Sequence, residues 1–285
     1  MDYRATLTYL DEIQGRGIKL GLDTMIRLLA AMADPHKAYP SVVVAGTNGK
    51  GSVCAMLDSI LRECGLRTGR YTSPHLVRYE ERIAVNGAPV TQSEFAAAVT
   101  TVSDHIGALT DKGALEVHPT HFEVLTAAAM HHFRQQGIDA GVLEVGMGGR
   151  LDAVAVARTT VAVITNVRLD HTKHLGRTEE AIAVQKAGVI REGCLAITGE
   201  SRPGPLKVIR DEARARGVRL IEKDHEARVA ISEGDAPVRF ALTTSRAVYP
   251  DLVVPFTGRH QIDNAVLAVL AAEAFRAPGP LSAEA

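Results

Sequence analysis

The stretch that decides the fold is Val42-Val-Val-Ala-Gly46-Thr-Asn-Gly49-Lys50-Gly51-Ser52. Residues 41–45 form a short valine-rich run, which is typical of a buried strand. A glycine-rich turn follows it, and residues 52–64 have the pattern of a helix. This order of strand, turn and helix aims backbone N–H groups and a helix N-terminus at an anion. The stretch therefore predicts a phosphate-binding loop in an α/β fold.

The loop provides the predicted nucleotide-binding residues, which are Gly46, Thr47, Asn48, Gly49, Lys50, Gly51 and Ser52. Lys50 supplies a charge for the β- and γ-phosphates, and Ser52 offers a hydroxyl to Mg²⁺. The strict GxxxxGK[ST] pattern is not met, because Gly46 lies three residues before Gly49 and Gly51 follows the lysine. The alternative interpretation is a flexible turn that carries an exposed lysine.

The rest of the chain alternates apolar runs with helical patterns, which favours a mostly parallel sheet flanked by helices. We predict a hairpin over 82–90 because Asn86-Gly87 suits a tight turn, and a helix beginning at Thr91 with Glu94 as its capping box. A short-stranded section occupies 227–254. The other predicted helices are 3–14, 23–33, 120–136, 178–189, 205–216 and 260–275, and the other strands are 139–145, 160–165, 195–198 and 218–221.

Composition excludes several classes of protein. The 285 residues suit one large domain or two modest ones, and 46% are apolar. A net charge of -1 and an aromatic content of 4% disfavour nucleic-acid binding. No apolar run reaches the roughly 18 residues of a membrane span, and the N-terminus lacks a signal-peptide core. Cys54, Cys64 and Cys194 are too widely spaced for a metal knuckle, so free thiols in the cytoplasm are expected.

The loop sequence Gly-Thr-Asn-Gly-Lys-Gly-Ser resembles the ATP loop of the Mur ligase superfamily. The glycine after the lysine is similar to the loop of folylpolyglutamate and dihydrofolate synthases. Other segments resemble that family in the same order along the chain. They are Thr72-Ser-Pro-His-Leu76, Thr120-His-Phe-Glu123, Leu143-Glu-Val-Gly-Met-Gly-Gly-Arg-Leu-Asp152, Asn166-Val-Arg-Leu-Asp-His171, Gln185-Lys-Ala-Gly188 and Gly258-Arg-His-Gln-Ile-Asp-Asn264.

This resemblance implies a P-loop-containing, Mur-ligase-like central domain over residues 1–276, with a linker or tail over 277–285. Members of the family carry a further C-terminal domain with an Asp-Gly-Ala-His-Asn-Pro motif. The sequence contains no such motif. We therefore expect the C-terminal glutamate-ligase domain to be absent from this chain.

The resemblance also implies a metal site. It assigns Glu144, Ser73, His171 and Lys186 to Mg²⁺, with Lys186 carbamylated, and makes Lys50, Glu144, His171 and Lys186 the catalytic set. From the residues alone, Glu144 could be a solvated strand-end charge and Lys186 an exposed helix lysine. His171 and His174 could suggest zinc, but no further ligand stands at a suitable spacing. Gln185 also replaces the glutamate that the family usually carries there.

Substrate contacts follow from the same resemblance. Asn264 matches an adenine-contacting asparagine, although a helix-surface asparagine is the alternative. Residues 73–82 resemble a loop that closes over the substrate, with Arg82 as a carboxylate contact. The remaining predicted substrate residues are Gly21, Leu22, Thr120, His121, Phe122, Glu123, Leu151, Asp152 and Ala153.

Together these features predict a monomeric, ATP- and Mg²⁺-dependent amide ligase that works through an acyl phosphate. It would add L-glutamate to folate, to dihydropteroate, or to both. The alternative is a non-catalytic ATP-binding fragment or pseudoenzyme that lacks half of the active site. A P-loop kinase or GTPase is disfavoured by Gly51 and by the lack of an Asn-Lys-x-Asp segment.

Overall fold

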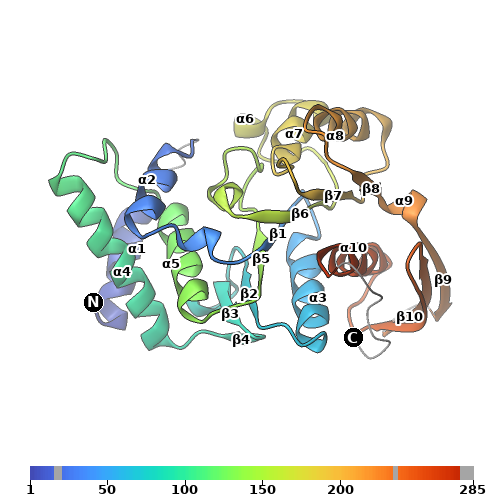
Figure 1. The fold of residues 1–285 in the computed structure, drawn as a ribbon, viewed down its shortest axis with the longest axis horizontal. Helices are drawn as coiled ribbons and strands as arrows, with labels where there is room; N and C mark the ends of the chain where they lie inside the picture. The colour runs from blue at the N-terminus through green and yellow to red at the C-terminus, as the bar shows by residue number, and fades with distance from the viewer. Residues whose placement is uncertain (16–20, 234–236, 277–285) are drawn as a thin grey trace.

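An eight-stranded, mostly parallel sheet forms the centre of the computed structural model, which describes residues 1–15, 21–233 and 237–276 (Figure 1). The strand order is β4-β3-β2-β5-β1-β6-β7-β8, and only the β2-β3-β4 end is antiparallel. The bounds are β1 Ser41–Ala45, β2 Thr68–Tyr71, β3 Ile83–Val85, β4 Ala88–Pro89, β5 Ala140–Glu144, β6 Thr159–Ile164, β7 Leu195–Thr198 and β8 Leu220–Glu222.

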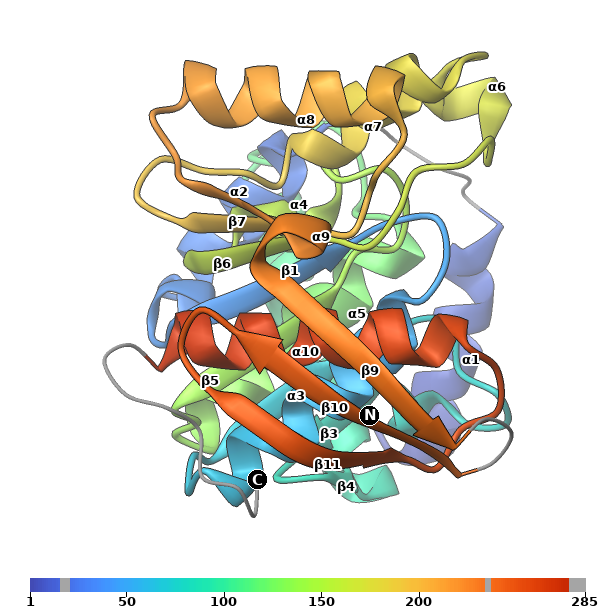
Figure 2. The same ribbon diagram turned by 90° about the vertical axis from the view of Figure 1, so that its right-hand side faces the viewer.

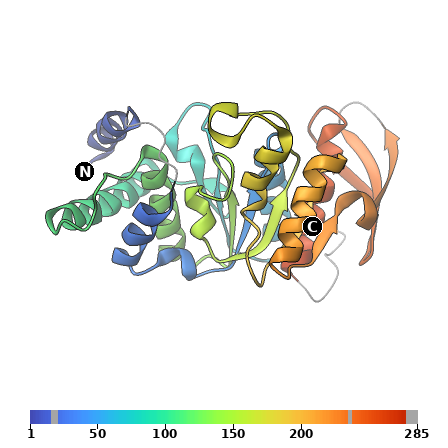
Figure 3. The same ribbon diagram turned by 90° about the horizontal axis from the view of Figure 1, so that it is seen from above.

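Helices cover both faces of this sheet. On one face α5, α7 and α8 pack against the sheet, with α1, α2 and α4 beside α5 (Figure 3). On the other face α3 and α10 lie side by side (Figure 1). The bounds are α1 Tyr3–Gln14, α2 Asp23–Ala31, α3 Lys50–Glu63, α4 Gln92–Asp111, α5 His121–Gln135, α6 Thr172–Leu175, α7 Glu179–Ala187, α8 Pro203–Ala215, α9 Lys223–Glu226, α10 His260–Phe275, and the 3₁₀ turns η1 Pro35–Lys37, η2 Tyr79–Arg82 and η3 Ala153–Val156.

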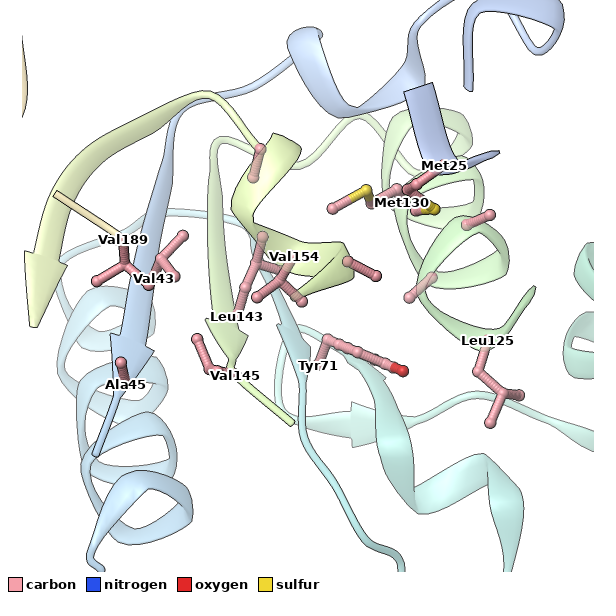
Figure 4. Packing of buried hydrophobic residues seen from close by; sticks show 14 of the residues in the cluster. Met25, Val43, Ala45, Tyr71, Leu125, Met130, Leu143, Val145, Val154 and Val189 are labelled. Atoms are coloured by element: carbon pink, nitrogen blue, oxygen red, sulfur yellow. The ribbon is translucent and has the colours of Figure 1, made fainter. Parts of the chain in front are cut away.

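The alternation of side chains along each strand creates two cores. In β1, Val43 and Ala45 face the α5 side, whereas Val42 and Val44 face α3 and α10. Figure 4 shows Val43 and Ala45 in the first core, with Leu143 of β5 and Val154 of η3. Because both faces are covered, β1 is buried throughout, and the residues after Ser41 are all apolar rather than alternating with polar ones.

A second, antiparallel sheet of three strands lies outside α10 (Figure 2). Its strands are β9 Ala227–Glu233, β10 Val238–Thr244 and β11 Val248–Val254. The hydroxyls of Thr244 and Tyr249 both donate to Oε1 of buried Glu273 on α10, at 2.8 and 2.9 Å. These bonds tie the small sheet to the helix. The predicted short strands are real, and each is seven residues long.

The structure confirms the α/β architecture and the hairpin, in which Asn86 and Gly87 have positive φ values of 50° and 83°. Thr91 caps α4 with the predicted capping box. Several predicted bounds differ from the structure by one or two residues, and the short helices α6 and α9 were not predicted. Helix α3 begins at Lys50 rather than at residue 52, and strand β2 was not predicted because Thr68-Gly-Arg-Tyr71 is not an apolar run. The predicted tail 277–285 lies outside the described residues.

The three cysteines are free thiols, and Cys54 and Cys194 are buried, as expected from their spacing. In the described part of the chain, no helix is long and apolar enough to cross a membrane.

Candidate nucleotide and substrate site

The predicted site residues lie where the parallel strands end. The phosphate loop follows β1 at the centre of the sheet, Glu144 ends β5 on one side, and Thr165 follows β6 on the other. Ser73 lies just beyond the end of β2. Strand β1 has neighbouring strands on both sides, and the connections of the chain run to either side of it. A crevice is therefore expected at the carboxyl end of β1. Strand order therefore brings together residues that are far apart in the sequence.

Two glycines of the loop are required by close packing. A Cβ on Gly46, whose φ is 155°, would lie 1.8 Å from Oγ1 of Thr165. A Cβ on Gly49, whose φ is 82°, would lie 2.3 Å from Oδ1 of Asn264. Asn264 is buried near the start of α10, so the interpretation as a helix-surface asparagine is wrong. Its amide packs against the phosphate loop, close to the site that the resemblance implied.

The loop is tethered to the segment after β6. Asn48 N–H donates to Oδ1 of Asn166, and Nδ2 of Asn166 donates back to the Asn48 carbonyl, both at 3.1 Å. The Thr165 hydroxyl donates to the same carbonyl at 2.6 Å. Thr47 exchanges two more bonds with the backbone of Arg168 through its hydroxyl. Sequence reasoning missed these tethers, because each joins residues about a hundred positions apart in the chain.

The open end of α3 points its N–H groups at the space above the loop. The first helical bond in the turn joins Val53 N–H to the Gly49 carbonyl at 2.9 Å. The N–H groups of Lys50, Gly51 and Ser52 therefore have no acceptor within the helix. Nζ of Lys50 folds back to the carbonyls of Gly46 and Thr47, at 3.2 Å each. Unpaired N–H groups and one ammonium make this end of the helix suitable for a polyphosphate.

Glu144 is buried beside the loop. Its side chain is not a solvated strand-end charge, because only 5% of the residue is exposed. The Ser73 N–H donates to Oε2 at 3.2 Å, and a Cβ on Gly51 would lie 3.6 Å from that oxygen. Burial raises the pKa of Glu144, while the Ser73 bond and the charge of Lys50 partly oppose this. A desolvated carboxylate with one hydrogen-bond donor can be stabilised by a divalent cation.

Lys186 is also buried, with 2% exposure, so the expectation of an exposed helix lysine is wrong. Burial and the nearby Lys50 charge lower the pKa of Lys186 to about 8, and Asp170 opposes the shift. About a tenth of the amine is therefore neutral at pH 7, far more than for an ordinary exposed lysine. His171 lies with its side chain half exposed and its Nε2 3.7 Å from Asp170. No three His, Cys, Asp or Glu side chains within the described ranges converge as a metal-binding group.

A cavity of about 500 Å³ adjoins Ser73 and His171, two of the predicted metal ligands. Of the ten predicted substrate residues, it is lined by all except Leu22, which caps the start of α2 without lining the cavity. These residues come from the segment before α2, the 73–82 loop, the start of α5 and the turn after β5. Gln14, Pro74, Gly146 and Met147 also line the cavity and were not predicted.

The cavity wall contains a buried cation and a neutral imidazole. Nε of Arg82 donates to Nδ1 of His75 at 2.8 Å, and the guanidinium lies 5.6 Å from the Tyr79 ring centre. Within the described part of the chain, Arg82 forms no ion pair. Burial and the charge of Arg82 lower the pKa of His121 to about 4, which keeps this imidazole uncharged. The positive charge of Arg82 is thus available to a ligand carboxylate.

Two predicted substrate residues also have local structural roles. Thr120 and Glu123 form the capping box of α5, in which each side chain bonds the backbone N–H of the other. Asp152 accepts bonds from the N–H groups of Met147 and Val154, at 2.9 and 3.0 Å. Burial raises the pKa of Asp152 to about 6. These carboxylates therefore shape the cavity wall through bonds to the backbone.

Glu200, just after β7, was not predicted and supports the tethers of the loop. Its side chain is 1% exposed, and it accepts the Val167 N–H at 2.6 Å and Nη1 of Arg168 at 3.2 Å. Nε of Arg202 donates to its other oxygen at 3.1 Å. Although burial opposes ionisation, these hydrogen bonds and the Arg202 charge lower the pKa of Glu200. Glu200 fixes the segment that holds Thr47 and Asn48.

A phosphate loop after the central strand of a parallel sheet, with a buried carboxylate ending the adjacent strand, defines a nucleotide-binding α/β protein. Residues 44–272 match the family described as the Mur ligase middle domain. The chain belongs to this family.

Curated relatives agree with this assignment. The chain is 39% identical to the dihydrofolate synthase/folylpolyglutamate synthase of Bacillus subtilis, over 92% of this chain and 61% of the relative. It is 36% identical to the protein of the same name in Escherichia coli, over 93% of this chain and 60% of that protein. The chain thus spans about three fifths of the length of these curated relatives.

Solved structures give the same answer. A folylpolyglutamate synthase from Thermotoga maritima aligns with a TM-score of 0.89 and 34% identity, over 99% of this chain and 64% of that chain. A structure described as an FPGS-AMPPCP-folate complex aligns with a TM-score of 0.91 and 32% identity, over 96% of this chain and 67% of the other. The fold and the order of elements are therefore those of this family of ligases.

Proposed function

We propose that this chain forms the ATP-binding part of an amide ligase that adds L-glutamate to folate, to dihydropteroate, or to both. The observation that carries the proposal is the cavity that adjoins Ser73, which nine predicted substrate residues line. The Ser73 N–H donates to Glu144, the carboxylate next to Gly51 of the phosphate loop. The site suited to a polyphosphate thus approaches, at Ser73, a pocket that holds the buried Arg82, which has no ion-pair partner among the described residues. Such a pairing suits transfer of a phosphoryl group to a bound carboxylate.

In this reaction a carboxylate oxygen of the acceptor attacks the γ-phosphorus of ATP, and ADP leaves. The amine of glutamate then attacks the acyl phosphate, and phosphate leaves as the amide bond forms. Lys50 and the N–H groups at the start of α3 neutralise the developing phosphate charge. Arg82 orients an acceptor carboxylate, and Phe122 offers an aromatic wall, which lies 2.7 Å from where a Cβ on Gly146 would be. These roles remain proposals for this chain.

Magnesium fits the residues around Glu144, because that carboxylate is desolvated and accepts only the Ser73 N–H among the described donors. Bound Mg²⁺ would neutralise phosphate charge during transfer. Ser73, Glu144, His171 and Lys186 are the proposed ligands. The low pKa of Lys186 supports carbamylation, because the neutral amine is the form that reacts with CO₂.

Carbamylation is tested by carbon-13 NMR of the protein in labelled bicarbonate. We expect one protein-bound carbamate resonance, which Lys186→Arg removes and Lys173→Arg leaves in place. Lys173 is a suitable control because it is an exposed lysine on α6. Absence of the resonance from the unsubstituted protein would contradict the proposal for Lys186.

The experiment for the function measures phosphate release from ATP in the presence of Mg²⁺, L-glutamate and either acceptor. We expect phosphate release to require both glutamate and an acceptor. The protein is proposed to act in the cytoplasm as a monomer. Since the chain spans about three fifths of its curated relatives, ATP-analogue binding without turnover would support the alternative, a non-catalytic nucleotide-binding protein. Failure to bind the analogue would reject both.

A further inference from the structure

A second cavity, of about 450 Å³, lies between α3, α10 and β11. No residue of the predicted nucleotide, metal or substrate sets lines it. It is bounded by α3 and α10, the helices on the far face of the sheet from the α5 helix, and is closed on the outside by the small sheet. Its volume lies within the range of roughly 300–1,000 Å³ that is usual for small-molecule sites.

Most of the wall of this cavity is apolar. Met56 and Ile60 of α3 face Val269 of α10, and Phe240 and Leu252 of the small sheet complete the wall. Figure 2 shows the small sheet lying across α10, with α3 behind it. An apolar or aromatic group placed here would lose contact with water on several sides, which favours binding.

One end of the cavity carries an unbalanced positive charge. Asp58 is buried, and its Oδ1 accepts the Thr68 hydroxyl. Nε of Arg62 lies 3.5 Å from its Oδ2, and Nε of Arg70 lies 3.6 Å from the same oxygen. Two guanidinium groups thus share one carboxylate oxygen, and these three lining residues together carry one positive charge; Glu144, which the Arg70 charge also reaches, does not line the cavity.

The same two groups have unmet hydrogen-bonding capacity. Nε of Arg62 and Nε of Arg70 are both buried without a hydrogen-bond partner. The β3–β4 turn covers one side of the Arg62 guanidinium, because a Cβ on Gly87 would lie 2.8 Å from its Cζ. Buried donors without acceptors are costly. Both Nε atoms lie against Asp58, so a ligand would have to use the terminal N–H groups of the guanidiniums. Within the described residues these terminal groups form no hydrogen bond, so they remain for an anion in the cavity.

We propose that this cavity binds a small amphipathic organic anion. Its apolar body would lie against Met56, Phe240 and Leu252, and its carboxylate would accept hydrogen bonds from Arg62 and Arg70. The guanidinium pair favours a carboxylate over a neutral polar group, because charge-assisted and forked hydrogen bonds are the stronger ones. This site is independent of the proposed ligase function, since binding requires neither ATP nor Mg²⁺.

The test compares 4-phenylbutyrate with its neutral counterpart 4-phenylbutanol in calorimetric titrations of the 285-residue chain. We expect the acid to bind about tenfold more tightly than the alcohol. Arg62→Gln and Arg70→Gln should each remove most of that difference and leave the weak binding of the alcohol unchanged. Arg214→Gln is the matched control, because Arg214 is an exposed arginine on α8.

Thermal unfolding and titration with the ATP analogue AMPPCP check that each variant is folded. If Arg70→Gln fails to fold, Arg62→Gln alone decides, since the Arg62 side chain is 31% exposed and that of Arg70 is 20% exposed. Equal affinity for acid and alcohol, or acid binding that neither substitution weakens, would overturn the proposal. So would a folded chain that binds neither compound.

Discussion

Two buried glutamates lie at the same edge of the sheet, Glu144 at the end of β5 and Glu200 after β7. Their pKa values are shifted in opposite directions. Glu144 accepts one backbone N–H, and burial raises its pKa. Glu200 accepts backbone N–H groups and two arginine side chains. Burial opposes its ionisation, but the bonds from the Arg202 and Val167 N–H groups and from the Arg202 side chain lower its pKa. Burial alone therefore does not reveal the role of a carboxylate. The number of hydrogen-bond donors around a buried carboxylate indicates its role.

The difference separates a group that can bind a ligand from a group that positions one. Glu144 keeps capacity for a cation next to Gly51 and Ser73, at a cost in stability. Glu200 has its capacity filled by the segment that tethers the phosphate loop. A catalytic carboxylate is expected to be under-satisfied in the free protein, whereas a positioning carboxylate is expected to be fully satisfied.

Replacing Glu144 should give the largest effect. We expect Glu144→Gln to lower the rate of ATP-dependent ligation about a thousandfold, because a neutral amide is a poor substitute for a carboxylate in holding Mg²⁺. The free energy of unfolding should stay the same or rise, since a desolvated charge is removed. Phosphate release and chemical denaturation measure the two quantities. A variant that loses activity only by unfolding would contradict the assignment.

Replacing Glu200 should mainly affect stability. We expect Glu200→Ala to lower the free energy of unfolding by about 3 kcal/mol, because Arg202 and the Val167 N–H lose a buried partner. AMPPCP affinity should fall with it, since the loop tethers loosen. Asp251→Ala is the control, because its ion pair with Arg239 is exposed and should contribute less than about 1 kcal/mol. Equal stability of the two variants would contradict this role for Glu200.

Weakening one tether should give a smaller change. We expect Thr165→Val to lower the free energy of unfolding by about 1 kcal/mol, since it removes the bond to the Asn48 carbonyl. Affinity for AMPPCP should fall several-fold, as measured by calorimetry, and Thr101→Val serves as the control on the exposed side of α4. Unchanged affinity in Thr165→Val would show that the tether does not position the loop.

The smallest effect is a difference in pH dependence. Because the pKa of Glu144 is raised on folding, its contribution to stability falls as pH rises from about 4.3 through the folded value. Stability of Glu144→Gln relative to the unsubstituted protein should therefore improve over that window. Glu200 has a lowered pKa, so its contribution is complete above about 4.3 and is lost as pH falls through the folded value.

The loss of unfolding free energy caused by Glu200→Gln should accordingly be greatest near neutral pH and become smaller as the pH falls. Denaturation midpoints between pH 3 and 7 (a span of about four units around the ordinary glutamate pKa) measure both trends. Trends of the same sign for the two variants would remove the distinction between the two glutamates.

Local patterns in the sequence predicted much of the fold. The valine run of β1, the glycine-rich turn, the Asn86-Gly87 hairpin and the Thr91 cap depend on neighbours a few residues away, and the structure confirms each one. Strand β2 was missed because its place beside β5, rather than its composition, makes it a strand.

The functional site was predicted in its residues but not in their packing. Family resemblance predicted the residues that line the cavity, and the structure brings nine of them together. Burial of Lys186 and Asn264 was not expected from the residues alone, because it depends on packing from distant segments. Asn166 begins one of the family-like segments, but its bonds to Asn48 and the role of Glu200 depend on contacts across the sheet edge that no spacing in the sequence reveals.

The central claim is that Lys50 and the start of α3 form the ATP site. Calorimetric titration of AMPPCP with Mg²⁺ into the unsubstituted chain, Lys50→Ala and the control Lys207→Ala tests it most directly. We predict binding to the first and third, and affinity weakened about tenfold or more in Lys50→Ala, since a charge-assisted contact to phosphate is lost. Equal affinity of all three proteins would contradict the assignment of the phosphate loop.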